Sequence, residues 1–439
     1  MTEGVKIVHD PVHGSIRVNG FFVDILDRHE MQRLRGVKQL GSADLVFPGA
    51  NHTRFEHCLG AYHLSGRMAE SLNLDDEDSL AVRAAGLMHD ICHAPFSHTL
   101  ESVMESATGL DHMELAHDLI TGRLQTYRDE DADLFGGTDS IGEILSDNGI
   151  DPEVVCGLIS SPETTNAEQN SLDSYFDGSA DHFRSKDYLH QIIHGPVDAD
   201  QMDYLMRDAH YTGVTAGHID LERIIATLRV HNDRLCISRS GAPAAEGLMV
   251  ARSLMYTSVY FHQTVRIINR MTVKAVEAAD LDLSKIYLWD DADLANTLIE
   301  CGGVSSKLIR MIRGRRFYRR VYSLSPLETT ENTVQILLEH SSRKKRWALE
   351  KEIADKAGID ESEVCVEMPS SSVLMSEVQI GKTDVSILEP DGKIVYLTKT
   401  SPIAKSLQSR DPFGWSVVVG CPPEHRDVVR KAAAKVLGV

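Results

Sequence analysis

The sequence lacks the features that mark secreted and membrane proteins. Its seven cysteines are odd in number and scattered, and no Cys-x-x-Cys pair occurs in the 439 residues. A disulfide framework or a cysteine-rich zinc site is therefore not expected, and a reducing compartment fits the chain. No apolar run approaches the roughly 18–20 residues that a membrane span needs. The N-terminal MTEGVKIVHDP has no charged-then-apolar signal pattern, so we expect a cytoplasmic protein without a membrane partner.

Positive charge is also scarce. Lys and Arg number 45 against 65 Asp and Glu, which gives a formal net charge of −20. A surface of this sign disfavours nonspecific binding to nucleic acids and anionic membranes, so nucleic acid is not an expected partner. An anionic substrate stays compatible with the sequence if metal ions or a few arginines concentrate positive charge locally. The basic runs 310–320 and 343–346 are interpreted as solvated faces, with nucleotide or subunit contacts as the alternative.

Length and patterning predict a mostly α fold: a helical core domain at 1–325 and a smaller C-terminal α+β domain at 326–439. Apolar periodicity and turn residues predict the following helices and an exposed loop in the first part: helices at 54–72, 79–90, 198–209 and 247–279, and the loop at 163–180. The second part has β-rich segments and one helix: strands at 364–367, 383–388, 394–398 and 415–421, and a helix at 424–437. Pro390-Asp391-Gly392 predicts a turn that joins the middle two strands into a hairpin.

Histidine and aspartate gather in four segments: RFEH at 54–57, HD at 89–90, HAPFSH at 93–98 and DADQMDYLMRD at 198–208. Imidazole nitrogen and carboxylate oxygen suit a borderline divalent metal, and three or four such ligands leave space for water or substrate. His57 lies on the apolar face of its predicted helix, and Asp90 ends a buried helix, where an unpaired polar group is costly. The alternative is that each is a hydrogen-bonded core or helix-end residue.

More histidines follow within a short stretch. His93 and His98 come within nine residues of His89, and Glu101 lies three positions beyond His98. A carboxylate at that spacing can orient an imidazole and adjust its basicity if the stretch is helical. His112 is either a further member of this group or a surface histidine.

Two later segments carry groups that suit a phosphate ester. One face of the predicted helix at 198–209 has a carboxylate, a phenol, a guanidinium and a second carboxylate: Asp200, Tyr204, Arg207 and Asp208. An intrahelical ion-pair stripe, in which Arg207 pairs with Asp203, is the alternative. Arg252, with Tyr260 near it on the later helix, could hold a phosphate through two N–H groups or serve a structural purpose.

The H…HD…D pattern is the signature of the HD superfamily of metal phosphohydrolases. Longer strings resemble the deoxynucleoside triphosphate triphosphohydrolases of that superfamily: KIVHDPVHGSIRVN, MQRLRGVKQLGSADLVFPGANHTRFEHCLGAYHL, MHDICHAPFSHTLE, VDADQMDYLMRDAHYTG and VYFHQTVR. The likeness is greatest to the branch with the sterile-alpha-motif and HD domain enzyme of vertebrates and its prokaryotic relatives. It runs from about Lys6 through the C-terminal segment, so we expect no sterile-alpha-motif domain.

The resemblance implies roles for individual residues. One divalent metal per subunit, with Fe, Mn, Mg, Zn and Ni not distinguished, is expected on four ligands: His57, His89, Asp90 and Asp200. The family's active-site residues fall on His93, His98, Glu101 and His112. Substrate contacts fall on Gln39 and Leu40 for sugar and base, Arg54 and Arg252 for phosphate, and Tyr204 and Tyr260. An activating GTP or dGTP site between subunits of a dimer or tetramer is expected at Lys6, Asp27, Gln32 and Arg35.

The expected function is therefore metal-dependent hydrolysis of (deoxy)nucleoside triphosphates to nucleoside and inorganic triphosphate, with His98 protonating the leaving 5′ oxygen. Two other interpretations stay open: an HD-type phosphomonoesterase or phosphodiesterase acting on nucleotides, and a nucleotide sensor without catalysis. The chain also departs from the vertebrate enzyme. Gln201 and Gln263 stand where that enzyme has lysines, and Cys92 and Ala94 replace the glycines that usually flank the histidine at 93.

Overall fold

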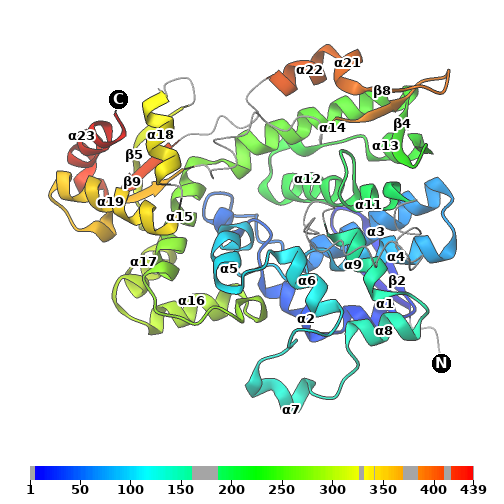
Figure 1. The fold of residues 1–439 in the computed structure, drawn as a ribbon, viewed down its shortest axis with the longest axis horizontal. Helices are drawn as coiled ribbons and strands as arrows, with labels where there is room; N and C mark the ends of the chain where they lie inside the picture. The colour runs from blue at the N-terminus through cyan, green and yellow to red at the C-terminus, as the bar shows by residue number, and fades with distance from the viewer. Residues whose placement is uncertain are drawn as a thin grey trace, which may run out of the picture.

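The computed structural model describes residues 5–160, 186–325, 331–340, 342–368, 384–409 and 417–438. The expected loop at 163–180 lies outside this part of the chain, as do residue 383 and residues 415–416 of two expected strands. Helices dominate the fold, so the mostly α class with a smaller C-terminal region that contains strands is confirmed (Figure 1). No described helix is both long and apolar enough to cross a membrane.

The helices up to residue 313 form one body around a continuous apolar core. Their bounds are α1 (Phe22–Leu26), α2 (His29–Arg33), α3 (Arg54–Leu72), α4 (Asp76–Met88), α5 (Glu101–Thr108), α6 (His112–Ile120), α7 (Ala132–Phe135), α8 (Ile141–Asp147), α9 (Pro152–Ile159), α11 (Asp187–Ile193), α12 (Ala199–Thr212), α13 (Leu221–Thr227), α14 (Ala242–Met255), α15 (Gln263–Glu277), α16 (Asp291–Glu300) and α17 (Gly303–Arg313). Later helices are α18 (Glu331–Glu339), α19 (Arg343–Ala357), α21 (Leu397–Thr400), α22 (Pro402–Ser409) and α23 (Arg426–Leu437).

Three of these helices surround the HD motif, and their ends follow from local sequence. The N-terminus of α3 is closed by Glu56, whose carboxylate accepts the backbone N–H of Thr53 at 2.6 Å. Asp75 caps α4 by accepting the N–H of Asp78 at 2.8 Å, and α4 ends at Met88, one residue before His89. Helix α3 packs against both α4 and α12, which brings three distant segments of the chain together.

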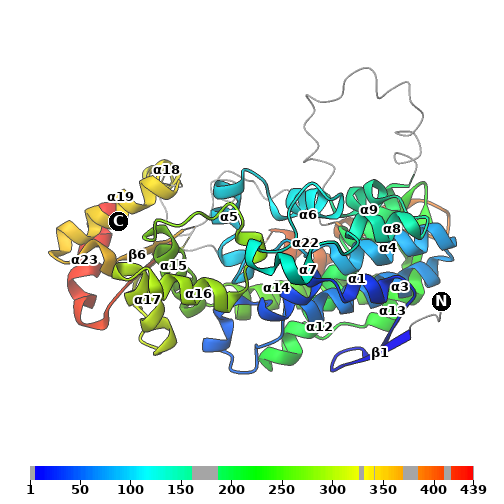
Figure 2. The ribbon, with the colours of Figure 1, turned by 90° about the horizontal axis from the view of Figure 1, so that it is seen from below.

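The strands form three small sheets. Their bounds are β1 (Val5–Asp10), β2 (Gly14–Asn19), β3 (Leu228–His231), β4 (Arg234–Ser238), β5 (Arg319–Leu324), β6 (Cys365–Glu367), β7 (Ser386–Leu388), β8 (Ile394–Tyr396) and β9 (Val417–Cys421). The antiparallel pair β1–β2 projects at one edge of the body (Figure 2). The other sheets have strand orders β3-β4-β7-β8 and β5-β9-β6. The pairs β1–β2 and β3–β4 were not predicted. The β7–β8 hairpin, antiparallel around the Pro390-Asp391-Gly392 turn, confirms the prediction.

The predicted single helix at 247–279 is wrong, because the structure breaks it into two. A π-helical turn over Tyr256–Tyr260 follows α14, and the N–H of Phe261 bonds to the carbonyl of Tyr256 at 2.9 Å. His262 then takes an extended conformation before α15 begins. Aromatic and β-branched residues fill this stretch, YTSVYFH, and they favour departures from α geometry more than the flanking sequences do.

The C-terminal region has its own apolar core, built from the β5-β9-β6 sheet and helices α18, α19 and α23. Helix α15 reaches from the body to this sheet, since it packs against α17 on one side and β6 on the other (Figure 1). A buried charge cluster fixes the contact: Glu350 of α19 accepts hydrogen bonds from Arg270 and Lys274 of α15 at 2.9–3.1 Å. Strands after residue 325 divide between two sheets, and the boundary at 325 stays a prediction.

Candidate metal centre and its surroundings

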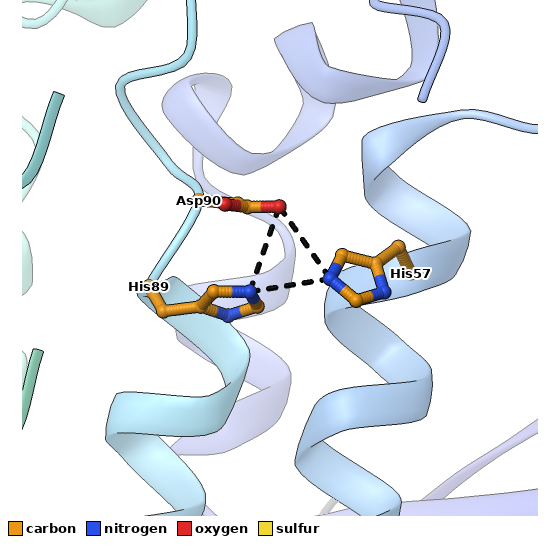
Figure 3. A group of neighbouring side chains, drawn as sticks. All are labelled: His57, His89 and Asp90. Carbon is orange, nitrogen blue, oxygen red and sulfur yellow. Dashed lines mark hydrogen bonds and ion pairs between the residues drawn. The ribbon is translucent and has the colours of Figure 1, made fainter. Parts of the chain in front are cut away.

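Four side chains from three helices converge at one point. His57 comes from α3, His89 and Asp90 directly follow α4, and Asp200 lies in the first turn of α12. The two Nε2 atoms of His57 and His89 are 3.2 Å apart, and each is 3.5 Å from Oδ2 of Asp90 (Figure 3). Oδ1 of Asp200 is 3.0 Å from His57 Nε2 and 3.7 Å from His89 Nε2. The distances fit ligands arranged around a single small cation.

The far sides of the two rings explain why their Nε2 atoms can bind metal. Nδ1 of His57 lies 2.7 Å from the Asp203 carboxylate, and Nδ1 of His89 lies 3.0 Å from the carbonyl oxygen of Gly86. Both partners are acceptors, so each Nδ1 donates, and in the neutral ring each Nε2 presents a lone pair. Two lone pairs that face each other at this distance repel unless a cation lies between them. The residues present therefore fit a divalent metal.

The charges of the cluster favour the same conclusion. Burial alone would raise the pKa of Asp90 and of Asp200. For Asp90 the charge of Arg54, together with the contacts from His89 and His93, outweighs burial. For Asp200 the hydrogen bonds and charges of His57 and His89 do so together, and both pKa values fall below the usual range. Burial would lower the pKa of His57, but Asp200 and Asp203 raise it to about 10. The negative charge that attracts a proton to this ring equally attracts a metal cation in its place.

Arg207 does not reach an open face of α12, because carboxylates surround it. Its Nε and Nη2 donate to Asp203 at 2.9 Å each, and its Nη1 donates to Asp10 at 2.7 Å. Asp203 also lies 2.6 Å from Nε2 of His13. The alternative in which Arg207 pairs with Asp203 is thus the one the structure contains. Asp10 and His13 were not singled out from the sequence; Asp203, one turn after Asp200, carried a usable signal in that spacing.

Arg54 lies between the metal ligands and the histidine-rich loop. Its side chain is buried and bonded to Asp90 through Nη1, and its Nε donates to the hydroxyl of Ser97 at 2.9 Å. Among the described residues, Nη2 of Arg54 has no hydrogen-bond partner although it is buried. An unpaired buried guanidinium N–H is costly, which favours an anionic ligand as its partner.

The four predicted active-site residues lie together on the other side of Asp90. Nε2 of His93 is 3.1 Å from Oδ1 of Asp90, and the His93 ring stacks on His112 with ring centres 4.2 Å apart. Glu101 bonds to Nδ1 of His98 at 3.1 Å and lies 2.7 Å from Nδ1 of His112, in an ion-pair contact whose angles do not make a hydrogen bond. The His98 side chain is 69% exposed, in contrast to the buried His93.

These surroundings set the charge states of the group. Burial and the nearby charges of Arg54 and His112 lower the pKa of His93 well below its ordinary range, so its ring is neutral. Burial alone would raise the pKa of Glu101, but His112 and His98 outweigh it and lower that pKa. The group thus combines a neutral imidazole, a carboxylate and an exposed imidazole, which is what proton transfer needs.

Ligand atoms of Asp90, His93 and His112 also lie within 4.8 Å of one another. A metal ion binds in the plane of an imidazole ring, yet the His93 and His112 rings are stacked at an interplanar angle of only 24°. One ion cannot lie in both planes at bonding distance from both nitrogens. Of the two groups, the one on the His57 side of Asp90 therefore has the geometry that suits a metal ion better.

Beside the metal cluster and the group around His93, a further part of the site is formed by α12, α14 and the π turn. Nη1 of Arg252 donates to Gln201 at 3.3 Å, and the Arg252 guanidinium lies over the ring of Tyr256. The rings of Tyr204 and Tyr260 meet edge to face. Asp208 lies behind Tyr260: it is buried and accepts the Tyr260 hydroxyl at 2.6 Å, and its other oxygen is 2.8 Å from His52.

The remaining predicted residues lie at two further places. Gln39 is buried, its Oε1 has no partner among the described residues, and Leu40 follows it at the edge of the core. The predicted activator residues are neighbours on the surface near α1 and α2. Lys6 forms an ion pair with Asp27, Gln32 donates to the carbonyl of Leu26 at 2.7 Å, and Arg35 donates to Gln32 at 2.8 Å.

Comparison with known protein families gives two matches along the chain. The family described as the HD domain matches residues 54–160, and the family described as the HD associated region matches residues 219–439. The first contains His57, His89 and Asp90, and the second contains Arg252, Tyr260 and the C-terminal region. A helical fold with buried histidines and an HD pair directly after α4, facing His57 of α3, defines the class. This chain belongs to the HD superfamily and carries the HD associated region.

Curated relatives agree with this assignment. An uncharacterized protein of Methanocaldococcus jannaschii is 30% identical over 98% of this chain and 82% of its own length. The deoxynucleoside triphosphate triphosphohydrolase SAMHD1 of Homo sapiens is 29% identical over 63% of this chain and 45% of its own length. The SAMHD1 homolog of Dictyostelium discoideum is 27% identical over 72% of this chain. This chain spans about half the length of the SAMHD1 relatives it matches, and the resemblance read from its motifs is confirmed.

Two solved structures share the fold over nearly the whole chain. A phosphohydrolase from Bacteroides thetaiotaomicron has a TM-score of 0.68 at 25% identity and covers 95% of this chain. A hypothetical protein from Aquifex aeolicus has a TM-score of 0.65 at 25% identity and covers 98%. The chain is therefore a member of a hydrolase class whose HD domain implies a divalent metal, and His57, His89 and Asp90 form a cluster able to hold it.

Proposed function

We propose that this protein hydrolyses (deoxy)nucleoside triphosphates to a nucleoside and inorganic triphosphate. One observation carries the proposal: Asp90 is shared by a metal-binding cluster and a group of proton-transfer residues, with the unpaired Nη2 of Arg54 beside them. Relatives named deoxynucleoside triphosphate triphosphohydrolase support the substrate class. Asp200 is proposed as the fourth metal ligand because its carboxylate approaches both histidines.

A bound divalent cation supplies Lewis acidity toward a phosphoryl group and toward water. The chain's own residues supply the proton and the charge. His98 is proposed to protonate the departing 5′ oxygen, because it is exposed and bonded to Glu101, which orients its ring. His93 and His112 stack behind Asp90 and keep that side of the site in place. Proton transfer from a positioned imidazole typically contributes a factor of about 10²–10⁴.

Phosphate and nucleoside contacts are proposed for the groups around this centre. Arg54 offers its unpaired N–H to the phosphate nearest the metal. Arg252 faces the phosphates of the substrate that lie further from the metal. Tyr204, Tyr260, Gln39 and Leu40 are assigned to the nucleoside side. Arg207 and Asp208 are left out, since Asp203, Asp10, Tyr260 and His52 already occupy their polar atoms.

The test uses the full chain with Mn²⁺ and a panel of dNTPs and NTPs, with and without GTP. Ion chromatography should find nucleoside and triphosphate in equal amounts. The variant His89→Gln should release far less of both products, while His218→Gln, a change at an exposed histidine away from the site, should match the wild type. Orthophosphate or a linear monophosphate as product would replace the proposal by a phosphomonoesterase or phosphodiesterase. No product with any nucleotide would leave a sensor as the better interpretation.

We also propose activation by GTP or dGTP at the patch of Lys6, Asp27, Gln32 and Arg35, with assembly into a dimer or tetramer. Carboxylate oxygens of Asp27 can accept hydrogen bonds from a guanine edge, while Lys6 and Arg35 offer positive charge. Both lie at the surface, and Arg35 is held over the ring of Phe55 at 3.7 Å.

Sedimentation velocity with and without GTP tests this second proposal. The expected result is a larger particle and faster triphosphate release with GTP, and loss of both effects in Asp27→Asn. Unchanged mass together with unchanged activity on adding GTP contradicts it, whatever the outcome of the substrate panel.

A further inference from the structure

The N-terminal ribbon β1–β2 reaches the candidate metal centre through a buried chain of three side chains. His13, in the turn of the ribbon, places Nε2 2.6 Å from Oδ1 of Asp203. Asp203 places Oδ2 2.7 Å from Nδ1 of His57. The side chains of His13, Asp203 and His57 are 2%, 0% and 1% exposed. The ribbon therefore contacts a metal ligand through one intervening carboxylate, shielded from water.

The direction of each hydrogen bond in this chain follows from the partners. Arg207 can only donate, and it donates to both oxygens of Asp203. Asp203 is thus an ionised acceptor on both oxygens, so Nε2 of His13 and Nδ1 of His57 must carry the protons that point at it. A donating Nδ1 leaves Nε2 of His57 free to bind metal, and a hydrogen-bonded carboxylate behind a ligand strengthens that ligand.

His13 is itself held from behind. Oδ1 of Asp10 accepts the backbone N–H groups of Val12 and His13 at 2.9 and 2.8 Å. Oδ2 of Asp10 accepts Nη1 of Arg207 at 2.7 Å. Asp10, His13, Asp203 and Arg207 thus close a ring of hydrogen bonds, and each oxygen of Asp203 has one histidine and one arginine nitrogen as partners.

The helix that carries His57 is shaped to admit this carboxylate. Gly60 lies one turn beyond His57 on α3, and a Cβ there would come within 1.8 Å of Oδ1 of Asp203 and 2.7 Å of Nη2 of Arg207. Any larger residue at position 60 would displace Asp203. The absence of a side chain at Gly60 is an observation independent of the hydrogen bonds, and it points to the same arrangement.

We propose that His13 is a positioning residue for the metal centre: through Asp203, the N-terminal ribbon fixes the orientation of His57 and sets the affinity for the divalent cation. The inference rests on the metal centre used in the proposed function but not on the identity of the nucleotide. Without His13, Oδ1 of Asp203 keeps only its Arg207 partner, and the orientation of the carboxylate toward His57 then depends on Arg207 alone.

Two matched substitutions at His13 test the proposal. In His13→Gln the side-chain amide can take the place of Nε2 and donate to Asp203, whereas the shorter His13→Asn places its amide near Nδ1 and cannot. The readout is the Kd for Mn²⁺, measured by electron paramagnetic resonance on the full chain without nucleotide. Loss of the partner directly behind a ligand, here Asp203, typically costs about 10–100-fold in metal affinity. His13 acts through Asp203, so His13→Asn should weaken binding by about tenfold, the lower end of that range.

The controls separate positioning from general damage. His13→Gln should stay close to the wild type. His9→Asn makes the same change at an exposed histidine of the same ribbon and should leave the Kd unchanged. Asp10→Asn keeps the His13 ring but weakens the hydrogen bonds that hold it, so it should raise the Kd for Mn²⁺ by a smaller factor. This variant replaces His13→Asn in the test if His13→Asn does not fold.

Equal Mn²⁺ affinity in the wild type, His13→Asn and Asp10→Asn would overturn the proposal. So would a His13→Gln variant as weak as His13→Asn, or a wild type that binds no Mn²⁺. If the Kd values differ as expected while no nucleotide is hydrolysed, the proposed substrate fails and the role of His13 stands.

Discussion

Two groups of histidines flank Asp90, and they differ in their hydrogen-bond partners and in their exposure to solvent. On one side, His57 and His89 each have the rear nitrogen bonded to an acceptor and are at most 4% exposed. On the other side, Nδ1 of His93 has no partner among the described residues, and His98 is largely exposed. The first environment fixes the tautomer and favours a cation; the second leaves imidazoles able to exchange protons. Both groups consist mainly of histidines, so their burial and hydrogen-bond partners, more than their residue type, distinguish metal binding from proton transfer.

Replacing a ligand on the metal side should have the largest effect. His89→Gln removes an imidazole that faces His57 at 3.2 Å. Because a Lewis-acid metal contributes several kcal/mol to such a reaction, we expect about a thousandfold loss of triphosphate release. Metal analysis after dialysis should show that the ion is lost as well. Full activity of His89→Gln with no bound metal would show that the His57–His89 group does not act through a metal.

The matching change on the other side, His93→Gln, should keep the metal. The buried, neutral His93 contacts Asp90 and stacks on His112, so its loss disturbs proton transfer without removing a ligand. We expect kcat to fall by about 10²–10⁴ at unchanged metal content. The measurement pairs triphosphate release with metal analysis on one sample. Loss of metal here would show that the two groups act as one.

Arg54 connects the groups, and Arg54→Lys tests the connection. Lysine keeps the positive charge beside Asp90, but its N–H groups all come from one nitrogen. It therefore cannot span the positions that Nε, Nη1 and Nη2 of Arg54 occupy. We expect kcat/KM to fall by about tenfold, the value of roughly one charged hydrogen bond. Steady-state kinetics on the best nucleotide of the panel measure it. An unchanged KM and kcat would argue that Nη2 of Arg54 meets no phosphate.

The smallest effect is expected from Asp291, which supports the loop of the second group. Its oxygens accept the N–H groups of Phe96 and Lys38 at 2.7 and 3.1 Å. Desolvation raises the pKa of Asp291 from 3.8 to about 6. The folded protein therefore holds a proton there that the unfolded chain releases, and the free energy of unfolding falls as pH rises between these values.

Asp291→Asn removes this titration, so the fall in stability between pH 4 and 6 should be shallower than in the wild type. Urea unfolding at several pH values measures the slope. At neutral pH, asparagine offers one acceptor oxygen to two N–H groups, and a modest drop in kcat with unchanged metal content should follow. Identical slopes in the two proteins would show that Asp291 does not titrate in this range.

Much of the metal side could be predicted from the sequence because its signals are local. The HD pair, the helix at 54–72 and the periodicity around Asp200 each need only one segment. The same applies to the fold class, since amphipathic helices and β-rich runs are read within short windows. Family resemblance then linked the segments, which periodicity cannot do.

What escaped prediction depends on pairs distant in sequence. His13 and Asp203 are 190 positions apart, and no local pattern reveals that a carboxylate on α12 has a partner in the first turn of the chain. The role of Arg207 was ambiguous for the same reason, because its second partner, Asp10 on β1, lies 197 positions away in the sequence. The break at Tyr256–Tyr260 is local, yet π turns have no simple sequence period.

The charge cluster where α15 meets α19 has a consequence for how the chain holds together. Arg270 and Lys274 are buried in the helical body, and Glu350, the carboxylate that both contact, lies in a helix eighty residues beyond Arg270. Lys274 also donates to two backbone carbonyls near the β6 strand. A buried cation without its anion is strongly destabilising. Arg270 also pairs with Glu277 of its own helix at 2.9 Å, whereas Lys274 has its carboxylate partner in Glu350. The C-terminal region thus supplies a buried anion to the helical body, and removing that region would leave Lys274 without it.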